Sequence, residues 1–500
     1  MAGSYAVADV VLIYPKTGLE ISTHVRAPLS ILTLGTTLKR NGYSVSLIDT
    51  RLTPEQRIVE EAKEAILVGI SSMTGLQIYH ALRASEMIRQ ANPSVPIVWG
   101  GVHPTLLPEQ TIRDPRVDIV VRGEGEQTII ELARALEGNR SLDGITGITY
   151  KDGDKILSNP DRPFIDLNTL LPLAWELLDR YVDEYILSTP WIFVGRRVLD
   201  TFTSRGCTHR CAFCYNPVFH KRKHRFANPE KVLEEFQLLV GRYRLDGLSL
   251  GMDDNTFIVK SRIQTICELM VKNLPDIRWR GDCRVDDLVN MPPDLLKVMS
   301  KSGCISLLIG AESGSIRILD LIKKDITPEQ IVESARICAK YNIIPSYEFL
   351  MGLPTETYED LMQTKSIIDQ ILMVNPNAPI MINIYHPYPG SELYELAKKH
   401  GLKEPSSLEE WCSSPSWMEA SAPWLEDKQR DFLERFSFMS YFLSALKWRG
   451  LKVPYHFKAA AKLFTIDAKL RWRLGKWGCA PEWDLMRRYY RKRSMRHVAL

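Results

Sequence analysis

The sequence has no long apolar run and no leader at its start. Among its 500 residues, the longest stretch without Asp, Glu, Lys or Arg is Gln370–Ser391, which four prolines interrupt. The apolar segment Phe436–Leu446 is well short of the ~18 residues that a membrane span requires. The first ten residues lack the positive and apolar regions of a signal peptide. We therefore expect no transmembrane helix and a reducing, cytoplasmic location, in which the nine cysteines are thiols or metal ligands.

The composition lacks any bias toward fibrous or disordered protein. Hydrophobic residues make up 45% and charged residues 25% of the chain, which is ordinary for globular domains, and the length suits roughly three domains. No repeat longer than a βα unit and no low-complexity tract is present. The charge is unevenly spread, because residues 443–500 contain 15 Lys and Arg against 3 Asp and Glu and leave a net −8 for the rest. We expect a distinct basic region at the C-terminal end.

Five β-branched runs alternate with amphipathic stretches in the first part of the chain. These runs lie at residues 9–15, 43–49, 64–72, 95–101 and 117–123. Nearly continuous apolar strands that alternate with helical patterns such as 29–40 predict a doubly wound parallel sheet over residues 1–145. Ligands of such sheets bind at the carboxyl ends of the strands, where Ser71 and Gly100 stand here.

A second βα series follows a connecting segment, residues 146–196, which is rich in Asp, Pro and Leu and indicates a linker. The six strand sequences of this series are VLDTFTS, GLSLGMDD, IRWRGDCR, ISLLIGAES, IPSYEFLMG and IMINIYHP. Six βα units are too few for the usual eight-stranded barrel and predict an open, partial (β/α)6 barrel over residues 197–400, with reactive groups at the carboxyl ends of its strands. The remaining residues, 401–500, have a mainly α-helical pattern.

One group of cysteines is tight enough to bind metal. Cys207, Cys211 and Cys214 form a CxxxCxxC array on the loop after the first strand of the second series. The nearest fourth ligands for a structural zinc site would be His209, His220 and His224. Three thiolates on a short loop can instead bind three irons of a four-iron, four-sulfur cluster and leave the fourth iron open for a substrate atom. The position of the loop at a strand end favours the cluster.

The array resembles the signature of the radical S-adenosylmethionine (SAM) enzymes, in which an aromatic residue, here Phe213, precedes the third cysteine. This resemblance implies a [4Fe–4S] cluster and a SAM site. It implies carboxylates for the methionine amino group, a guanidinium for its carboxylate, acceptors for the ribose hydroxyls and an apolar segment for the adenine. In that order, the matching residues are Asp253 and Asp254; Arg284; Glu312 and Ser313; and Met351, Gly352 and Leu353. Each also has a structural interpretation, as a helix cap, a surface ion pair or a turn.

Residues 1–140 resemble the cobalamin-binding domain that precedes the barrel in the cobalamin-dependent branch of this superfamily. The resemblance rests on segments such as VGISSMT, VWGGVHPTLLPE and VVRGEGEQTIIEL. It implies a corrinoid at the strand ends, with hydroxyls for its nucleotide tail and glycines that let the ring approach the backbone. The implied contacts are Ser71, Ser72, Thr74, Gly100, Gly101, His103, Glu124 and Gly125. The alternative is a nucleotide-binding or ligand-free flavodoxin-like domain.

The DxHxxG motif, by which many cobalamin proteins supply a histidine to cobalt, is absent. His24 is preceded two places earlier by Ser22, and His103 by Gly101. We therefore expect the lower face of the corrin to lack a protein imidazole from that motif. We expect His103 instead to contact the rim of the corrin or to cap the turn that follows it.

Together the two resemblances imply an enzyme that uses a [4Fe–4S] cluster, SAM and cobalamin. We expect a methyltransferase that acts on an unactivated carbon or phosphinate, with an external electron donor such as flavodoxin or ferredoxin. A cobalamin-dependent oxidative cyclase or ring-rearrangement enzyme is the first alternative, because it uses the same motifs. A corrinoid-binding regulator without enzymatic activity is the second, and the intact cysteine triad argues against it.

Nine aromatic residues are interleaved with the basic residues of the C-terminal end. This composition suits an anionic membrane surface, RNA or a helical lid that packs on the barrel. The lid is the simplest interpretation, and RNA is the least favoured. Peripheral contact with the inner membrane surface would imply a lipid-like substrate or a hydrophobic tetrapyrrole. The aromatic residues are Trp448, Tyr455, Phe457, Phe464, Trp472, Trp477, Trp483, Tyr489 and Tyr490.

Overall fold

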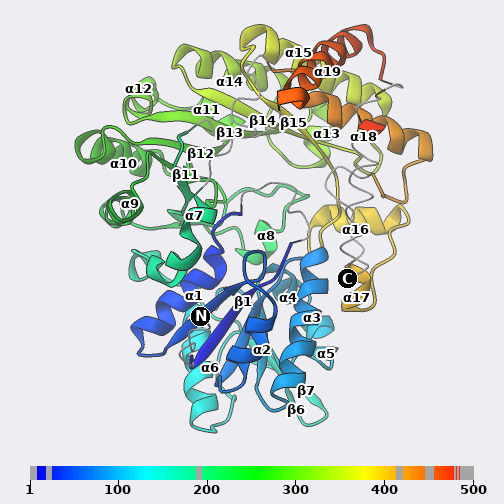
Figure 1. Ribbon diagram of the computed structural model, residues 1–500. Helices are drawn as coiled ribbons and strands as arrows, with labels where there is room; N and C mark the ends of the chain where they lie inside the picture. Colours follow the sequence, from blue (N-terminus) through cyan, green and yellow to red (C-terminus); the bar gives the residue numbers. More distant parts are fainter. Residues whose placement is uncertain are drawn as a thin grey trace.

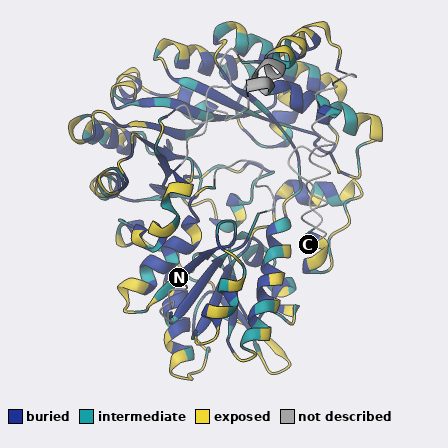
Figure 2. Cartoon of the chain, in the orientation of Figure 1, coloured by how far each residue is buried: buried dark blue, intermediate teal, exposed yellow. Residues whose placement is uncertain are grey.

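Two α/β layers, one above the other in Figure 1, make up most of the molecule. The structure is a computed structural model, and it describes part of the chain. The described residues are 8–17, 25–186, 194–412, 420–444, 455–477, 480 and 483–484, with the backbone alone for 455–462. Buried residues concentrate in the two sheets and in the helix faces that cover them, as Figure 2 shows.

The first sheet has the strand order β2-β1-β3-β4-β5-β6-β7, and its first five strands in sequence are parallel. Its strands are β1 (Val10–Tyr14), β2 (Val45–Asp49), β3 (Leu67–Ser71), β4 (Ile97–Gly100), β5 (Ile119–Val121), β6 (Ile148–Asp152) and β7 (Lys155–Ser158). The predicted doubly wound domain is thus confirmed. The hairpin of β6 and β7 pairs antiparallel with β5, so the sheet also takes in residues from the start of the segment that the sequence assigns to a linker.

Helices cover both faces of the first sheet because its strands are apolar on both sides. In β1, Val10 and Leu12 belong to the core shared with α1 and α6, whereas Val11 and Ile13 belong to the core on the other face, with α2 and α3. The helices are α1 (Leu29–Arg40), α2 (Gln56–Ala62), α3 (Leu76–Ala91), α4 (Val102–Leu106), α5 (Pro108–Arg113) and α6 (Glu126–Glu137).

The connecting segment is fastened to both layers. It contains the short helices η1 (Leu167–Thr169), η2 (Trp175–Tyr181) and α7 (Val182–Tyr185). Glu235 in the second layer accepts hydrogen bonds from Trp175 Nε1 at 2.6 Å and Leu173 N at 2.9 Å. Ala174 N donates to Thr36 Oγ1 in α1 at 3.0 Å. These contacts tie the two layers to one common segment.

The second sheet is a curled, six-stranded parallel half-barrel with the order β15-β14-β13-β12-β11-β8, which confirms the predicted partial barrel. Its strands are β8 (Val198–Asp200), β11 (Gly247–Leu250), β12 (Arg278–Arg284), β13 (Cys304–Glu312), β14 (Ile344–Met351) and β15 (Ile380–Ile384). A separate antiparallel pair is formed by β9 (Ser204–Arg205) and β10 (Arg225–Phe226). Figure 1 shows the open side of the half-barrel facing the first layer.

Helices follow the barrel strands, and most of them cover the outer face of the sheet, whereas α8 lies between the two layers in Figure 1. They are α8 (Asn216–Phe219), α9 (Pro229–Tyr243), α10 (Lys260–Asn273), α11 (Val285–Val289), α12 (Pro293–Lys301), α13 (Ile316–Leu321), α14 (Pro328–Lys340), α15 (Tyr358–Val374) and α16 (Glu392–Lys399). Local sequence sets where they begin. Capping boxes of Thr327 with Gln330 and of Thr357 with Asp360 start α14 and α15, and Pro328 occupies the first turn of α14.

The C-terminal region is helical in its described part and packs inward. Its helices are α17 (Leu408–Trp411), α18 (Asp427–Ser440) and α19 (Tyr455–Leu474). Ser437 Oγ donates to the carbonyl of Ile382 in β15 at 2.5 Å, and Trp472 Nε1 donates to Asp369 Oδ1 at 2.7 Å. The rings of Trp472 and Trp477 lie against Phe436. These contacts favour the lid. Among the other predicted aromatics, Trp448, Tyr489, Tyr490 and the side chains of Tyr455 and Phe457 lie outside the described residues.

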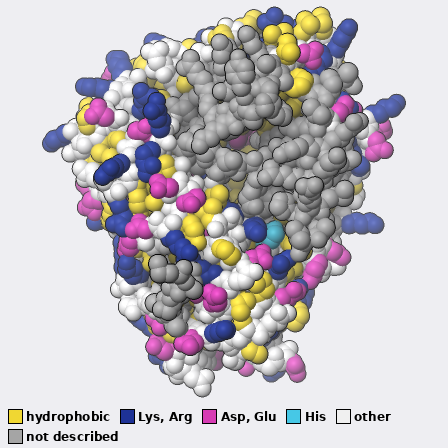
Figure 3. Space-filling view, viewed as in Figure 1, with side chains coloured by type: hydrophobic (Ala, Val, Ile, Leu, Met, Phe, Trp, Pro, Cys, Tyr) yellow, Lys and Arg dark blue, Asp and Glu magenta, His cyan; other side chains and the backbone are white. Residues whose placement is uncertain are grey.

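Charges of both signs are interspersed over the described surface that Figure 3 shows. The net negative charge of the chain before residue 443 is therefore not gathered into one field on this face. None of the helices in the described ranges combines the length and apolarity needed to cross a bilayer.

Candidate functional site

The three cysteines lie on one loop between β9 and α8. Cys211 is buried, and Cys207 and Cys214 are half-buried. Two hydrogen bonds reach the sulfurs, because Arg284 Nη1 donates to Cys211 Sγ at 3.2 Å and Asn216 N donates to Cys214 Sγ at 3.4 Å. Such donors stabilise thiolates, so the chemistry of this donor set fits a cluster held by three cysteines.

A single metal ion fits these thiols poorly. Within the described residues, no three Cys, His, Asp or Glu side chains converge on a site for one ion. His220 is already engaged, since its Nδ1 lies 3.0 Å from Arg225 Nη2 and its Nε2 lies 3.5 Å from Asp254 Oδ2. The geometry therefore favours an iron–sulfur cluster over a closed zinc site.

The fold itself occupies two of the predicted SAM residues. Asp253 accepts hydrogen bonds from Thr203 N at 2.6 Å, Thr203 Oγ1 at 2.7 Å and Ser204 N at 2.8 Å. The hydroxyl of Ser313 is buried and lies 3.1 Å from Thr364 Oγ1. It also accepts a hydrogen bond from Ser315 N. Asp253 therefore positions the chain that leads into the cysteine loop, and Ser313 shapes its own turn.

Asp254 lies directly at the start of the cysteine loop. It accepts hydrogen bonds from Gly206 N at 2.5 Å and Asn216 Nδ2 at 2.7 Å. Gly206 has a φ of +81°, and a Cβ there would lie 2.1 Å from the carbonyl oxygen of Lys223. The loop thus needs glycine at this position, and Asp254 holds both of its ends together.

Four other predicted residues converge around a side chain that the sequence analysis missed, Lys324. Its Nζ donates to Glu312 Oε1 at 2.7 Å and lies 5.9 Å from the centre of the Phe213 ring. Its carbonyl accepts a hydrogen bond from Arg284, which also contacts Cys211. The cluster loop, a guanidinium, an ammonium and a carboxylate therefore meet at one place, as a site for a zwitterionic methionine group requires.

The predicted adenine segment is covered by the C-terminal region. Met351 and Leu353 are buried, and both backbone groups of Gly352 are engaged. Gly352 N donates to Glu356 Oε2 at 2.6 Å, and its carbonyl accepts from Trp424 Nε1 at 3.0 Å. Burial raises the pKa of Glu356 to about 8. A flat ligand at this segment would therefore contact apolar side chains and the side of the segment that Trp424 covers. It would not find a free backbone N–H or carbonyl at Gly352.

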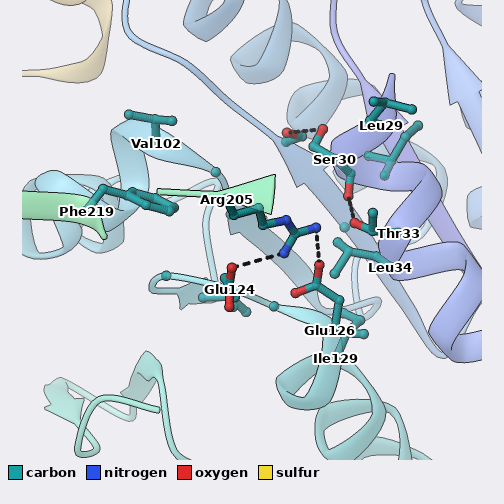
Figure 4. Close-up of a pocket in the computed structure, with 18 of the residues that line it drawn as sticks. Leu29, Ser30, Thr33, Leu34, Val102, Glu124, Glu126, Ile129, Arg205 and Phe219 are labelled. Atoms are coloured by element: carbon teal, nitrogen blue, oxygen red, sulfur yellow. Dashed lines mark hydrogen bonds and ion pairs between the residues drawn. The ribbon is translucent and has the colours of Figure 1, made fainter. Parts of the chain in front are cut away.

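The first sheet carries a cavity of about 310 Å³ at the carboxyl edge of its strands. Figure 4 shows residues of α1 and α6 next to each other on one side of this cavity, and Val102 and Phe219 on the other side. Aliphatic side chains from three strands and from α6 form its floor, and Ser30, Thr33 and Ser71 supply hydroxyls. The floor residues are Leu12, Val98, Val121 and Ile129 with the glycine of β3, Gly69. The volume is typical of a small-ligand pocket and suits one end of a corrinoid, not the whole.

Glycines keep this cavity open. A Cβ on Gly69 would lie 2.7 Å from Leu12 Cδ2, and one on Gly125 would lie 3.2 Å from Leu34 Cδ2. Gly101 has a φ of +103°, and a Cβ there would lie 2.7 Å from the carbonyl oxygen of Ser72. Of the predicted cobalamin residues, Ser71, Gly100, Gly101, Glu124 and Gly125 line the cavity. An open cradle of this kind fits a large, neutral cofactor that binds by shape.

Three predicted cobalamin residues are not part of the cavity lining. Ser72 is buried, and Thr74 Oγ1 lies 3.0 Å from His103 Nδ1. The His103 ring is fully buried and packs edge-on against Trp411, with 5.4 Å between ring centres. Burial lowers the pKa of His103 to about 4, so the ring is neutral near pH 7. His103 joins the first layer to the C-terminal region.

Glu124 lines the cavity but is engaged by the second layer. It accepts hydrogen bonds from Arg205 Nη1 at 3.1 Å, Arg225 Nη1 at 2.7 Å and Ile165 N at 2.9 Å. Arg205 Nη2 lies 2.8 Å from Glu126 Oε1, and Figure 4 shows this guanidinium between the two carboxylates. Sequence reasoning missed Arg205, although it stands two residues before Cys207 and so links the cysteine loop to the cavity.

Comparison with known proteins supports this two-part site. The profile of the B12 binding domain matches residues 23–133, and that of the radical SAM superfamily matches residues 201–367. An uncharacterized methyltransferase of Pyrococcus horikoshii is 31% identical over 408 residues, which cover 79% of this chain and 84% of that protein. The anaerobic magnesium-protoporphyrin IX monomethyl ester cyclase of Rubrivivax gelatinosus is 29% identical over 76% of this chain and 68% of its own.

A solved structure has the same fold. The cobalamin-dependent SAM radical enzyme OxsB with aqua-cobalamin bound superposes with a TM-score of 0.72 at 19% identity, over 99% of this chain and 76% of that one. Because both domain profiles match in the order observed and the Pyrococcus relative spans most of both chains, the protein belongs to the cobalamin-dependent radical SAM enzymes, whose cofactors are a [4Fe–4S] cluster, SAM and cobalamin.

Proposed function

We propose that the protein is a methyltransferase that acts on an unactivated carbon or phosphinate of a small molecule. The observation that carries this proposal is that one cavity is lined from both layers. Its walls include Gly101 and Gly125 of the first layer and Tyr215, Phe219 and Asp254 beside the cysteine loop. When bound, the cluster supplies the electron that cleaves SAM, and methylcobalamin supplies the methyl group.

The residues of the chain bind and orient these groups. Arg284 places a positive charge beside Cys211, where it would hold the methionine carboxylate of SAM. The Lys324 ammonium lies beside Glu312 and Phe213 and adds a second positive charge to this region. Glu312 would accept hydrogen bonds from the ribose. Phe219 forms an apolar wall between the cysteine loop and the cavity, which would keep water from a radical.

The names of the relatives support two reactions. The Pyrococcus relative is named a methyltransferase, and the Rubrivivax relative is named a cyclase. Methyl transfer is favoured because the Pyrococcus relative is the more similar of the two and more of its length is covered. Oxidative cyclisation is the second candidate.

The test uses the reconstituted holoenzyme, a low-potential reductant and SAM with a trideuterated methyl group. Methyl transfer gives a product that is heavier by one trideuterated methyl group. Cyclisation gives a product without deuterium that has lost hydrogen. The second result would replace the methyltransferase with a cyclase and leave the cofactor sites unchanged.

We also infer an external electron donor such as flavodoxin or ferredoxin. The reaction needs one electron for each SAM cleaved, and the described cysteines outside the loop form no second metal site. Cys267, Cys283, Cys304 and Cys338 are buried in the barrel core. A reduced flavodoxin that supports SAM cleavage in place of a chemical reductant would establish this partner class.

We propose a peripheral membrane contact through α19. Four apolar side chains on this helix are 54–68% exposed and follow one another at helical spacing. They are Leu463, Ile466, Leu470 and Leu474. A stripe of this kind beside basic residues is typical of interfacial helices. We expect co-sedimentation with anionic but not neutral liposomes at low salt, and weaker co-sedimentation when Leu463 and Leu470 are both replaced by Gln.

A further inference from the structure

The inner face of the half-barrel is charged, although its outer face is apolar. Strand register identifies the inner face, because residues opposite one another on neighbouring parallel strands point to the same side. Asp200 of β8 is opposite Ser249, and Ser249 is opposite Arg280. The alternate residues face the helices and are fully buried and apolar. Those residues include Leu199, Leu248, Leu307, Ile309, Tyr347 and Phe349.

The same register continues across the sheet. Asp282 is opposite Leu308, and Gly310 is opposite both Arg284 and Glu348. Gly310 has no side chain, so the Lys324 ammonium can occupy the space next to it on the inner face. A Cβ on Gly310 would lie 2.9 Å from Lys324 Nζ. One continuous face thus carries aspartate, arginine and glutamate side chains from β8 to β14.

Some of these charges are matched within the fold. Arg280 forms an ion pair with Asp282, and Lys324 forms one with Glu312. The first layer adds Arg26, whose Nε lies 3.5 Å from Asp200 Oδ2 and whose side chain is 48% exposed. The half-barrel and the cobalamin-binding layer therefore both contribute charges to one space.

Two carboxylates on this face keep unused hydrogen-bonding capacity. Neither carboxylate oxygen of Asp200 has a hydrogen-bond partner in the described part of the chain, and the same holds for Nε of Arg280. Glu348 is half-buried and forms no hydrogen bond with the described residues. Burial, with the charges of Glu312 and Asp282 nearby, raises the pKa of Glu348 to about 7. Buried polar groups are normally hydrogen-bonded, so the Asp200 oxygens, which have only the ion pair with Arg26, and the Glu348 carboxyl group leave capacity for a ligand.

We propose that this face binds a water-soluble substrate through hydrogen-bond donors, which Asp200, Asp282 and Glu348 accept. The inference rests on the proposed function only in placing the substrate beside the SAM site. Carboxyl oxygens that have no hydrogen-bond donor match the donors of hydroxyl groups, protonated amines or guanidines. Carboxylates and phosphates carry no proton to donate to these oxygens, and hydrocarbon would leave them without a hydrogen-bond partner. A lipid-like substrate and a hydrophobic tetrapyrrole are therefore disfavoured for this chain, so the proposed membrane contact through α19 would position the enzyme and would not deliver its substrate.

The test uses a small-molecule extract of the organism that encodes the protein, separated into four fractions. The probes are its chloroform phase and three aqueous fractions, which bind to a cation exchanger, to an anion exchanger or to neither. Each is added to the reduced holoenzyme with methyl-labelled SAM, and release of 5′-deoxyadenosine and transfer of the label are measured. We expect the cation-exchanger fraction or the neutral aqueous fraction to increase 5′-deoxyadenosine release at least tenfold. The first result would identify an amine or guanidine, and the second a hydroxylated compound.

Stimulation by the chloroform phase, by the anionic fraction or by no fraction would overturn the proposal. The two readouts separate it from the proposed methyl transfer. If an aqueous fraction increases 5′-deoxyadenosine release and no label is transferred, the methyltransferase is wrong and the substrate class stands. If the chloroform phase accepts the label, the methyltransferase stands and the substrate class is wrong.

Variants locate the effect on the inner face. Asp200→Asn and the nearly isosteric Glu348→Gln should each reduce the stimulated release at least tenfold, with iron content and SAM binding unchanged. The matched control is Asp154→Asn, because Asp154 is exposed in the turn between β6 and β7. Iron content and the circular dichroism spectrum show whether each variant is folded. Full stimulation in both folded inner-face variants would contradict the assignment.

Discussion

The two ligand-binding edges of the molecule are built in the same way and lined by different chemistry. Each lies at the carboxyl edge of a parallel sheet. The cavity of the first sheet is formed by glycines, aliphatic side chains and a few hydroxyls. The inner face of the half-barrel carries ion pairs and, at Asp200, a buried carboxylate without a hydrogen-bond partner among the described residues. The comparison teaches that one edge selects its ligand by shape and the other by charge.

The two edges meet at Arg205, which belongs to the second layer and contacts carboxylates of the first. Charged groups are thus present at the cavity too, but these groups pair with one another and join the two layers. Substitutions that affect one edge and spare the other can break this comparison or sharpen it.

The largest effect is expected from the cysteines. Cys207→Ala, Cys211→Ala or Cys214→Ala should abolish the cluster and with it SAM cleavage, because two thiolates cannot hold the four irons. Hydroxocobalamin binding to the first sheet should remain. Iron and sulfide analysis, 5′-deoxyadenosine release and a cobalamin titration check these outcomes. Cys412→Ala is the control, since Cys412 is half-buried and lies outside the loop. A triad variant that retains four irons would contradict the assignment.

A smaller effect is expected where the edges join. Arg205→Leu removes the partner of Glu126, whose side chain is only 3% exposed. An unpaired buried carboxylate costs about 3 to 5 kcal/mol of the free energy of unfolding. Urea denaturation measures this loss, and the double variant Arg205→Leu/Glu126→Leu should recover part of it. Arg242→Leu is the control, because Arg242 pairs with Asp179 at an exposed position and should have little effect. Equal losses in both single variants would show that the junction is an ordinary surface pair.

The sequence predicted what depends on local pattern. Strand and helix periodicity identified both sheets, and the spacing of three cysteines identified the cluster loop. It did not predict contacts between distant segments. Arg205 and Glu124 are 81 residues apart, and Lys324 reaches Glu312 through a turn whose path is set by tertiary packing. For the same reason Asp253 and Ser313 have suitable side chains at strand ends, yet their oxygens are engaged by Thr203 and Thr364, which are distant in the sequence.

The shape of the cavity can be altered at one glycine. Gly125 has a φ of −95°, so a larger residue fits the backbone there, and its side chain would enter the cavity near Leu34 and Val121. Gly125→Leu should weaken hydroxocobalamin binding about tenfold, or ~1.4 kcal/mol, and leave the iron content unchanged. Gly241→Ala in α9 is the control, because no atom lies within 4 Å of its added Cβ. Unchanged cobalamin affinity in Gly125→Leu would place the corrinoid elsewhere.

The smallest effect concerns protons, and it has opposite signs at the two edges. His103 next to the first sheet has a pKa lowered from 6.5 to about 4 by burial, so the unfolded chain binds the extra proton between these values. Its contribution to stability therefore rises from about pH 4 to about pH 6.5. Glu348 has a pKa raised from 4.5 to about 7, so the native chain holds the extra proton. Its contribution falls as the pH rises from about 4.5 to about 7.

In the wild-type protein these two contributions offset each other over most of the range, and single substitutions should separate them. Without cofactors, Glu348→Gln should make the urea midpoint rise more steeply with pH between about 4.5 and about 6.5, because the opposing carboxyl is gone. His103→Gln should make the slope of the midpoint against pH smaller than in the wild-type protein over the same range, because the contribution of the imidazole is gone. The difference between the two slopes is the measurement, since each variant serves as the control for the other. Parallel slopes would mean that the shape-selective and charge-selective edges do not differ in how they hold protons.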